Sequence, residues 1–247
     1  MPDFQLFIVP LITLLSFFVK GATGFGNAMV MVPLLSVMVG VHQAIVVTSI
    51  LDILGGSILF YKTVSMKSKA FWFPMAAAMI AGSIAGGVAL AHVPVQEFEI
   101  ALGAVVMVLG AWFVMGRGGK DESTLPTMTP KKCKPADAAV SAFAGFCGGL
   151  FGISGPPIVF YLGTRLAKTA FRSTLIALFL FSSIARISTY SVMGLVDKTA
   201  LLLAIISIPG MLLGLWLGSH LFIRIREVWF SRLIGAVLIF SALRLMM

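Results

Sequence analysis

Three charged side chains lie deep inside hydrophobic segments of this sequence: Lys20, Asp52 and Arg186. Charges at membrane depth are costly, so they usually mark a binding site or an ion pair. Lys20 directly precedes a glycine-rich stretch, and Arg186 lies in the middle of the apolar run 173–193. Two cations at such depth predict a binding site for an anion. The alternatives are an ordinary lysine at a membrane edge for Lys20 and a structural ion pair for Arg186.

Asp52 lies centrally in the apolar run 43–61 and is the acidic residue of the chain at that depth. Its carboxylate could pair with Lys20, pair with Arg186, or carry a coupling proton. The sequence does not separate these three roles, so Asp52 enters as a coupling candidate.

Two glycine-rich stretches carry the rest of the candidate site. Residues 20–27 read Lys-Gly-Ala-Thr-Gly-Phe-Gly-Asn, and residues 145–157 read Gly-Phe-Cys-Gly-Gly-Leu-Phe-Gly-Ile-Ser-Gly-Pro-Pro. Glycine lets a backbone approach a ligand closely, and Pro156-Pro157 suits the first turn of a helix. A helix that starts at such a tip points free N–H groups and its positive dipole end at a ligand.

We therefore predict that these stretches form the substrate site of a small anion. The alternative is that the glycines merely allow tight helix packing. The predicted substrate-binding residues are Lys20, Thr23, Gly24, Gly26, Asn27, Gly152, Ser154, Gly155 and Arg186.

The segments that hold these residues have the composition of membrane spans. Hydrophobic residues make up 59% of the 247-residue chain and charged residues 11%, against about 25% charged in globular proteins. Several apolar runs reach the ~20 residues that a helix needs to cross a bilayer. The sequence predicts an all-α polytopic membrane protein.

The basic residues are concentrated in connectors. Thirteen of the 18 Lys and Arg lie in residues 62–70, 117–136, 163–172 and 220–228. This is the cytoplasmic bias of membrane loops, and the net charge of +9 is therefore no sign of a nucleic-acid partner.

The two halves of the chain resemble each other. Gly21–Gly26 matches Gly149–Ser154 at a shift of 128 residues, and Gly82 and Gly86 match Gly210 and Gly214 at the same shift. Such matches predict an internal repeat. We expect a first repeat over 1–116, a cytoplasmic linker over 117–136 and a second repeat over 137–247.

Threading the chain between the basic connectors gives each repeat one hairpin and three spans. The segments 4–39 and 137–162 must then return to the side from which they enter, so we expect re-entrant helical hairpins with their tips near the midplane. Corresponding helices run in opposite directions, which makes the repeat inverted and puts both termini outside. The predicted spans are 43–61, 71–91, 98–116, 173–193, 199–219 and 229–246.

Other chemistry is not indicated. Cys133 and Cys147 form no CxxC motif, and no metal-ligand spacing, nucleotide-binding loop or nucleophile elbow occurs in the sequence. We expect no cofactor, no metal and no enzyme activity.

The glycine-rich stretches, each opening one half of an eight-segment chain, resemble those of the sulfite exporter TauE/SafE family. Gly24-Phe-Gly26-Asn27 followed by Pro33-Leu34 and Gly152-Ile-Ser154-Gly155 carry the resemblance, with Asn27 and Ser154 where glycine is commoner. The resemblance implies a multi-pass permease of the inner membrane that moves small anions such as sulfite or organosulfonates, often outward.

We therefore expect a secondary transporter, an exporter of sulfite, an organosulfonate or a small carboxylate, that works by alternating access. Its partners would be the anion, membrane lipid, a coupling proton or sodium ion, and a second copy of the chain in a homodimer. Alternatives are a passive anion channel on the same scaffold, a redox or enzyme protein that uses Cys147, and a membrane scaffold.

Overall fold

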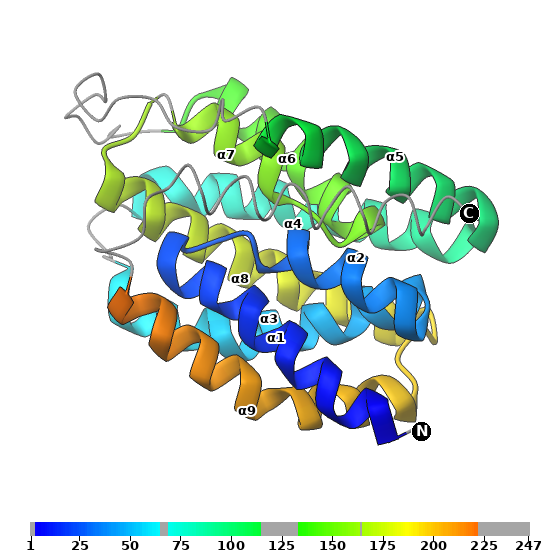
Figure 1. Cartoon of the computed structure of the whole chain (residues 1–247). Helices are drawn as coiled ribbons and strands as arrows, with labels where there is room; N and C mark the ends of the chain where they lie inside the picture. The colour runs from blue at the N-terminus through cyan, green and yellow to red at the C-terminus, as the bar shows by residue number, and fades with distance from the viewer. Residues whose placement is uncertain (1–2, 65–68, 115–132, 164, 222–247) are drawn as a thin grey trace. The chain divides into compact units, whose positions relative to one another are not determined.

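The computed structural model describes residues 3–64, 69–114, 133–163 and 165–221. All the regular secondary structure of these residues is helical (Figure 1). The helices of this described part are α1 Asp3–Thr23, α2 Asn27–Val39, α3 Val41–Thr63, α4 Lys69–His92, α5 Val95–Val114, α6 Pro135–Phe151, α7 Gly155–Gly163, α8 Lys168–Val192 and α9 Lys198–Leu221.

Four of these helices, α3, α4, α8 and α9, are long and apolar enough to cross a membrane. They coincide with four of the predicted spans, and α5, with 20 residues, corresponds to the span predicted at 98–116. The predicted span 229–246 and most of the linker 117–136 lie outside the described residues. The prediction of an all-helical polytopic membrane protein is confirmed.

Each of the two segments predicted as hairpins contains two helices separated by a short break. Residues 24–26 join α1 to α2, and residues 152–154 join α6 to α7. The tips are smaller than the glycine-rich stretches suggested, because α6 continues as helix through Gly145, Gly148 and Gly149. Glycine is a poor helix former, so a specific packing contact must favour the helix there.

That contact is the packing of α6 against α4 (Figure 1). A Cβ atom on Gly145 would overlap the carbonyl oxygen of Met79, and one on Gly149 would overlap that of Ser83. Small residues allow two helix backbones to approach this closely. For these two glycines the packing alternative is therefore correct.

The described helices form two compact units. The first contains α1, α2, α5, α9 and the start of α3 up to Val47, and the second contains the rest of α3 with α4, α6, α7 and α8. Each of the predicted repeats therefore contributes helices to both units.

In the first unit, α1 runs beside α9 (Figure 1). A Cβ on Gly214 of α9 would overlap the carbonyl oxygen of Leu14, and one on Gly218 would overlap that of Phe18. The α9 glycines thus bring its backbone onto that of α1.

The second unit repeats these contacts. Gly82 and Gly86 of α4 meet the carbonyl oxygens of Ala142 and Phe146 of α6 in the same way. Ala142 and Phe146 lie 128 residues after Leu14 and Phe18, which is the predicted shift. The two units therefore share one helix-packing motif, which supports the internal repeat.

The glycines of α4 and α9 that pack against these residues are related by a different shift in residue number. Gly82 and Gly86 correspond in their contacts to Gly214 and Gly218, 132 residues later, rather than to Gly210 and Gly214. The predicted pairing is thus wrong by four residues, about one helical turn. Because α9 carries glycine at three successive turns, residue identity alone could not fix the register.

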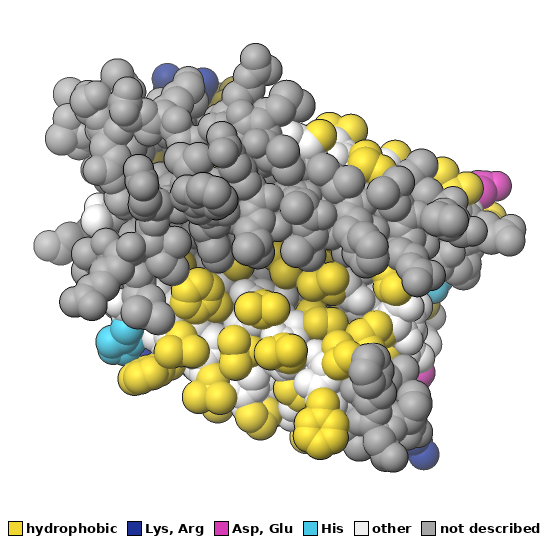
Figure 2. Space-filling view, viewed as in Figure 1, with side chains coloured by type: hydrophobic (Ala, Val, Ile, Leu, Met, Phe, Trp, Pro, Cys, Tyr) yellow, Lys and Arg dark blue, Asp and Glu magenta, His cyan; other side chains and the backbone are white. Residues whose placement is uncertain are grey.

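Hydrophobic side chains cover the face of α1 and α9 that Figure 2 shows. A continuous apolar surface of this kind suits contact with lipid acyl chains. Its exposed residues are Phe7, Leu11, Leu15, Leu201, Leu202, Ile205, Leu212, Leu213 and Trp216.

Candidate functional site

The tip of the α6–α7 hairpin is a compact turn. Gly152 has a φ of 72°, a left-handed conformation that glycine adopts without the steric penalty of a Cβ. Its N–H donates to the carbonyl oxygen of Gly148 at 2.9 Å and so closes the last turn of α6. Ser154 is buried and lies against Gly148, where an added Cβ would come within 2.9 Å of the serine Oγ.

The start of α7 offers fewer donors than the sequence argument assumed. The first four N–H groups of a helix have no partner within the helix, but Pro156 and Pro157 carry no N–H at all. Only Gly155 and Ile158 supply such a donor. A site at this helix start depends on additional groups.

Arg186 binds the opposite end of the break, the C-terminus of α6. Its Nη1 donates to the carbonyl oxygens of Gly152 at 3.0 Å and Gly148 at 3.3 Å. The last carbonyls of a helix lack helical partners and form the negative end of its dipole, so they attract a cation. Arg186, only 1% exposed, thus holds the tip in place.

Asp52 is the counter-ion of Arg186. Nη2 of Arg186 donates to Oδ2 of Asp52 at 3.1 Å and to Oγ of Ser183 at 2.9 Å. The side chains of Arg186 and Asp52 are 2% and 5% exposed, which makes this a buried ion pair. The pairing of Asp52 with Arg186 is one of the alternatives left open by the sequence, and the structure shows it. The carboxylate balances the positive charge of Arg186.

Two residues of this cluster were missed in the sequence. The hydroxyl of Tyr190 donates to the carbonyl oxygen of Gly149 at 2.7 Å, next to the carbonyls that Arg186 binds. Ser183 contacts Arg186 directly. Ser183, Arg186 and Tyr190 are spaced by three and four residues, so they share one face of α8. This spacing was the signal that could have found them.

Two buried polar atoms beside this ion pair have no hydrogen-bond partner: Nε of Arg186 and Oγ of Ser49. Ser49 precedes Asp52 by three residues, on the same face of α3. Other buried serines of the described helices, such as Ser16 and Ser141, donate to the carbonyl oxygen four residues earlier. Unpartnered buried polar atoms are rare and are often explained by a bound ligand.

The base of the α6–α7 hairpin is held by Asp137. One carboxylate oxygen accepts from the hydroxyl of Tyr161 at 2.7 Å and from Nη1 of Arg165 at 3.3 Å. The other accepts from the backbone N–H of Lys134 at 2.7 Å and so fixes the start of α6. These contacts join the start of α6 to the end of α7.

The tip of the α1–α2 hairpin belongs to the first unit. Gly24 and Gly26 have φ values of 87° and 89°, so both adopt left-handed conformations. The N–H of Gly24 donates to the carbonyl oxygen of Lys20 at 2.7 Å and ends α1. Gly26 precedes Asn27, the buried first residue of α2, and no side chain caps this helix.

Thr23 and Lys20 have different surroundings in this tip. The hydroxyl of Thr23 lies 2.9 Å from the carbonyl oxygen of Val19 and 2.7 Å from that of Phe25. Its single proton thus serves the turn, which favours a positioning role. Lys20 is 2% exposed, and its Nζ lies 5.4 Å from the ring centroid of Phe17 in a cation–π contact.

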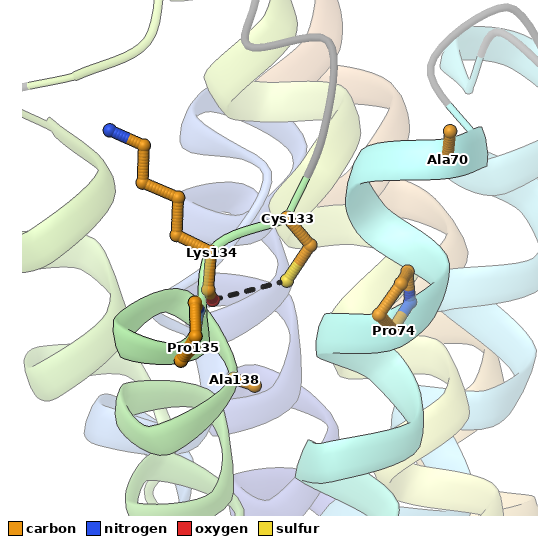
Figure 3. A pocket seen from close by; sticks show the side chains of 6 residues that line it. All are labelled: Ala70, Pro74, Cys133, Lys134, Pro135 and Ala138. Atoms are coloured by element: carbon orange, nitrogen blue, oxygen red, sulfur yellow. Dashed lines mark hydrogen bonds between the residues drawn. The ribbon is translucent and has the colours of Figure 1, made fainter.

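A pocket of about 400 Å³ lies at the start of α6, away from the glycine tip of the same unit (Figure 3). Cys133 faces it with its thiol 3.5 Å from the carbonyl oxygen of Lys134. Burial, and secondly the charge of Asp137, raise the pKa of the Cys133 thiol. The pocket is lined by Ala70, Pro74, Cys133, Lys134, Pro135 and Ala138.

Metal binding finds no support in the described residues, where no three His, Cys, Asp or Glu side chains gather. Cys133 and Cys147 are both free thiols. The candidate chemistry is therefore that of the two tips and their buried cations.

Long apolar helices, two broken hairpins and a buried cation beside each break define a multi-pass membrane protein of the transporter class. The family model of the sulfite exporter TauE/SafE matches residues 9–245, nearly the whole chain. The chain belongs to the sulfite exporter TauE/SafE family, a family of membrane anion transporters, as the glycine-rich stretches indicated. No curated protein and no solved structure matches it.

Proposed function

We propose that this chain is a secondary transporter that exports a small sulfur oxyanion, an organosulfonate or a small carboxylate. It acts in the inner membrane by alternating access. The observation that carries the proposal is the shared build of the hairpins: each breaks at left-handed glycine and has a buried cation beside the break, Lys20 in one and Arg186 in the other.

The chemistry of each tip favours an anion. The start of α2 has no side-chain cap beside Gly26, and the positive end of its helix dipole attracts an anion. Gly155 and Ile158 supply donors at the start of α7, with Ser154 beside them. Broken helices at membrane depth are tolerated where they are buried or line a cavity, which is typical of transporter substrate sites.

The energy source would be an ion gradient or the membrane potential, because the sequence has no nucleotide-binding loop. A passive anion channel is the alternative within transport. It would conduct the anion down its gradient at a rate that does not depend on any coupling ion.

The test begins with purified full-length protein and a thermal-shift screen against sulfite, thiosulfate, sulfoacetate, methanesulfonate, taurine, acetate and oxalate. Taurine, a zwitterion at neutral pH, controls for net charge. We expect stabilisation by at least one small anion, and counterflow of that anion in proteoliposomes. Absence of both for every anion would overturn the proposal.

The Cys147→Ser variant separates transport from redox or enzyme chemistry. A transporter that uses the tips should keep its full counterflow activity in this variant. Complete loss of activity with normal folding would favour the alternative in which Cys147 carries out redox or enzyme chemistry.

A further inference from the structure

The guanidinium of Arg186 uses only part of its donor set. Nη1 binds the carbonyl oxygens of Gly148 and Gly152, and Nη2 binds Asp52 and Ser183. The remaining donor, Nε–H, is buried and has no partner. Arginine presents five N–H donors in a fixed fork, so the direction of this unused donor is set by the contacts of the others.

Ser49 supplies a second unused polar group beside the same ion pair. Its hydroxyl is buried, has no partner, and projects from the face of α3 that carries Asp52 one turn later. The Nε–H of Arg186 can only donate, so a ligand that satisfies it must accept hydrogen bonds. An oxyanion could accept from both Nε–H and the Ser49 hydroxyl.

The charges of Arg186 and Asp52 bear on whether a proton binds together with such an oxyanion. Arg186 and Asp52 together are neutral, and their side chains are almost fully buried. An arriving oxyanion would bring a further negative charge to this neutral pair. An uncompensated buried charge is strongly unfavourable, and a buried carboxylate can remove it by binding a proton.

We propose that Arg186 and Ser49 bind the transported anion, that the anion replaces Asp52 as the counter-ion of Arg186, and that Asp52 takes up one proton from solution for each anion bound. This inference rests on the proposed transport function and names its coupling ion. A monovalent anion would then cross together with one proton, without net charge movement.

Several other titratable groups of this unit have contacts of their own. Tyr190 of α8 donates to Gly149, and Asp137, Tyr161 and Arg165 bond to one another at the base of the α6–α7 hairpin. The helices α3, α4, α6 and α8 of this unit also carry Tyr61, Lys62, Lys69, His92, Cys147, Lys168 and Arg172. The ion pair on which the proposal is built is the one between Arg186 and Asp52.

The test is calorimetric titration of the full-length protein with methanesulfonate, which remains a monoanion over the working pH range. Repeating it in buffers with different ionisation enthalpies gives the number of protons that the protein takes up. We expect about one proton per anion and an affinity that falls about tenfold per pH unit. Binding to the wild-type protein without proton uptake would overturn this inference and leave the transport proposal intact.

Asp52→Asn should bind methanesulfonate without proton uptake and with an affinity independent of pH. Asp137→Asn is the matched control, since it neutralises the other described ion-paired aspartate of this unit and should keep wild-type proton uptake. Proton uptake that persists in Asp52→Asn would overturn the proposal. If Asp52→Asn does not fold, the proton number and pH profile of the wild-type protein decide by themselves.

Ser49→Ala tests the second ligand group. We expect a two- to tenfold loss of affinity, the range of one neutral hydrogen bond. Ser141→Ala is its control, because Ser141 is equally buried but donates to the carbonyl oxygen of Asp137. Equal affinities in Ser49→Ala and the wild-type protein would remove Ser49 from the site.

Discussion

Asp137 and Arg165 are joined by a contact of 3.3 Å between a carboxylate oxygen and Nη1, although 28 residues of chain separate them. The tip of the α6–α7 hairpin lies between these two positions in the sequence. The contact therefore brings the start of α6 close to the segment that follows α7.

The first prediction concerns sidedness. Cys133 lies just before α6, on the side where the basic linker is expected. A membrane-impermeant maleimide should label Cys133 from the cytoplasmic side only, with Cys133→Ser as the blank. A cysteine added at the C-terminus should be labelled from outside only. Cytoplasmic labelling of the C-terminus would contradict the inverted repeat.

A second prediction follows from the raised pKa of the Cys133 thiol. The thiolate is the reactive form, so labelling should be slow at neutral pH and accelerate as the pH rises towards the raised pKa. Burial is the first cause and the charge of Asp137 the second. Asp137→Asn should therefore lower this pKa in part and speed labelling at a fixed pH. Mass spectrometry of timed samples measures the rate, and identical rates in the two proteins would contradict the assigned cause.

Gly26 provides a test of the tip in the first unit. Its φ of 89° strains any residue with a Cβ, so Gly26→Ala should cost about 1–2 kcal/mol of stability and weaken anion binding. Gly40→Ala is the matched control, since Gly40 has a φ of 84° and open space around a Cβ, outside the tip. Both variants should lose stability, and only Gly26→Ala should lose affinity. Equal affinities would remove this tip from the site.

The repeated packing motif predicts equal sensitivity at equivalent positions. Gly82→Ala and Gly214→Ala should each destabilise the protein by about 1–3 kcal/mol, because the added methyl overlaps a carbonyl oxygen of the facing helix. Gly56→Ala is the control, since its Cβ would meet only the Leu180 side chain at 3.4 Å. Thermal unfolding in detergent compares the three. A stable Gly214→Ala protein would contradict the proposed equivalence.

The role of Arg186 must be tested with a single and a double variant, because Arg186 both supports the tip and is proposed to bind the anion. Arg186→Gln alone removes one partner of the buried Arg186–Asp52 ion pair, which costs about 3–5 kcal/mol. Arg186→Gln combined with Asp52→Asn should recover most of that stability. Its affinity should remain about ten- to a hundredfold below wild type, the loss expected for a charged hydrogen bond. Wild-type affinity in the double variant would exclude Arg186 as an anion ligand.

The helices were predictable from the sequence because each is a long apolar run between charged or glycine-containing connectors. The prediction that the hairpins return to their side of entry rests on loop charge, since positive residues favour the cytoplasmic side. The residues at which each tip begins and ends could not be predicted from the sequence. Gly145, Gly149 and Gly152 are all glycines, so residue type does not distinguish them. The facing carbonyl oxygens of α4 determine that Gly145 and Gly149 remain in the helix.

The candidate site shows the same limit. Depth and charge identified Asp52 and Arg186 as special, but their pairing depends on how α3 lies against α8, which a one-dimensional pattern does not contain. The proton of Thr23 is occupied by its own turn, and the unused hydroxyl of Ser49 differs from its neighbours only in orientation. Neither the contact of the Thr23 hydroxyl nor the unused hydroxyl of Ser49 can be recognised from the sequence.

The way in which the units combine helices has a consequence for biosynthesis. α6 finds its partner α4 already made, since Gly82 and Ala142 are 60 residues apart in the chain. α1 must wait for α9, because Leu14 and Gly214 are 200 residues apart. At a synthesis rate of about 5–20 residues per second, that wait lasts roughly 10–40 s. During this interval α1 has no permanent neighbour on the face that later packs against α9, so the insertion machinery must protect that face until α9 is made.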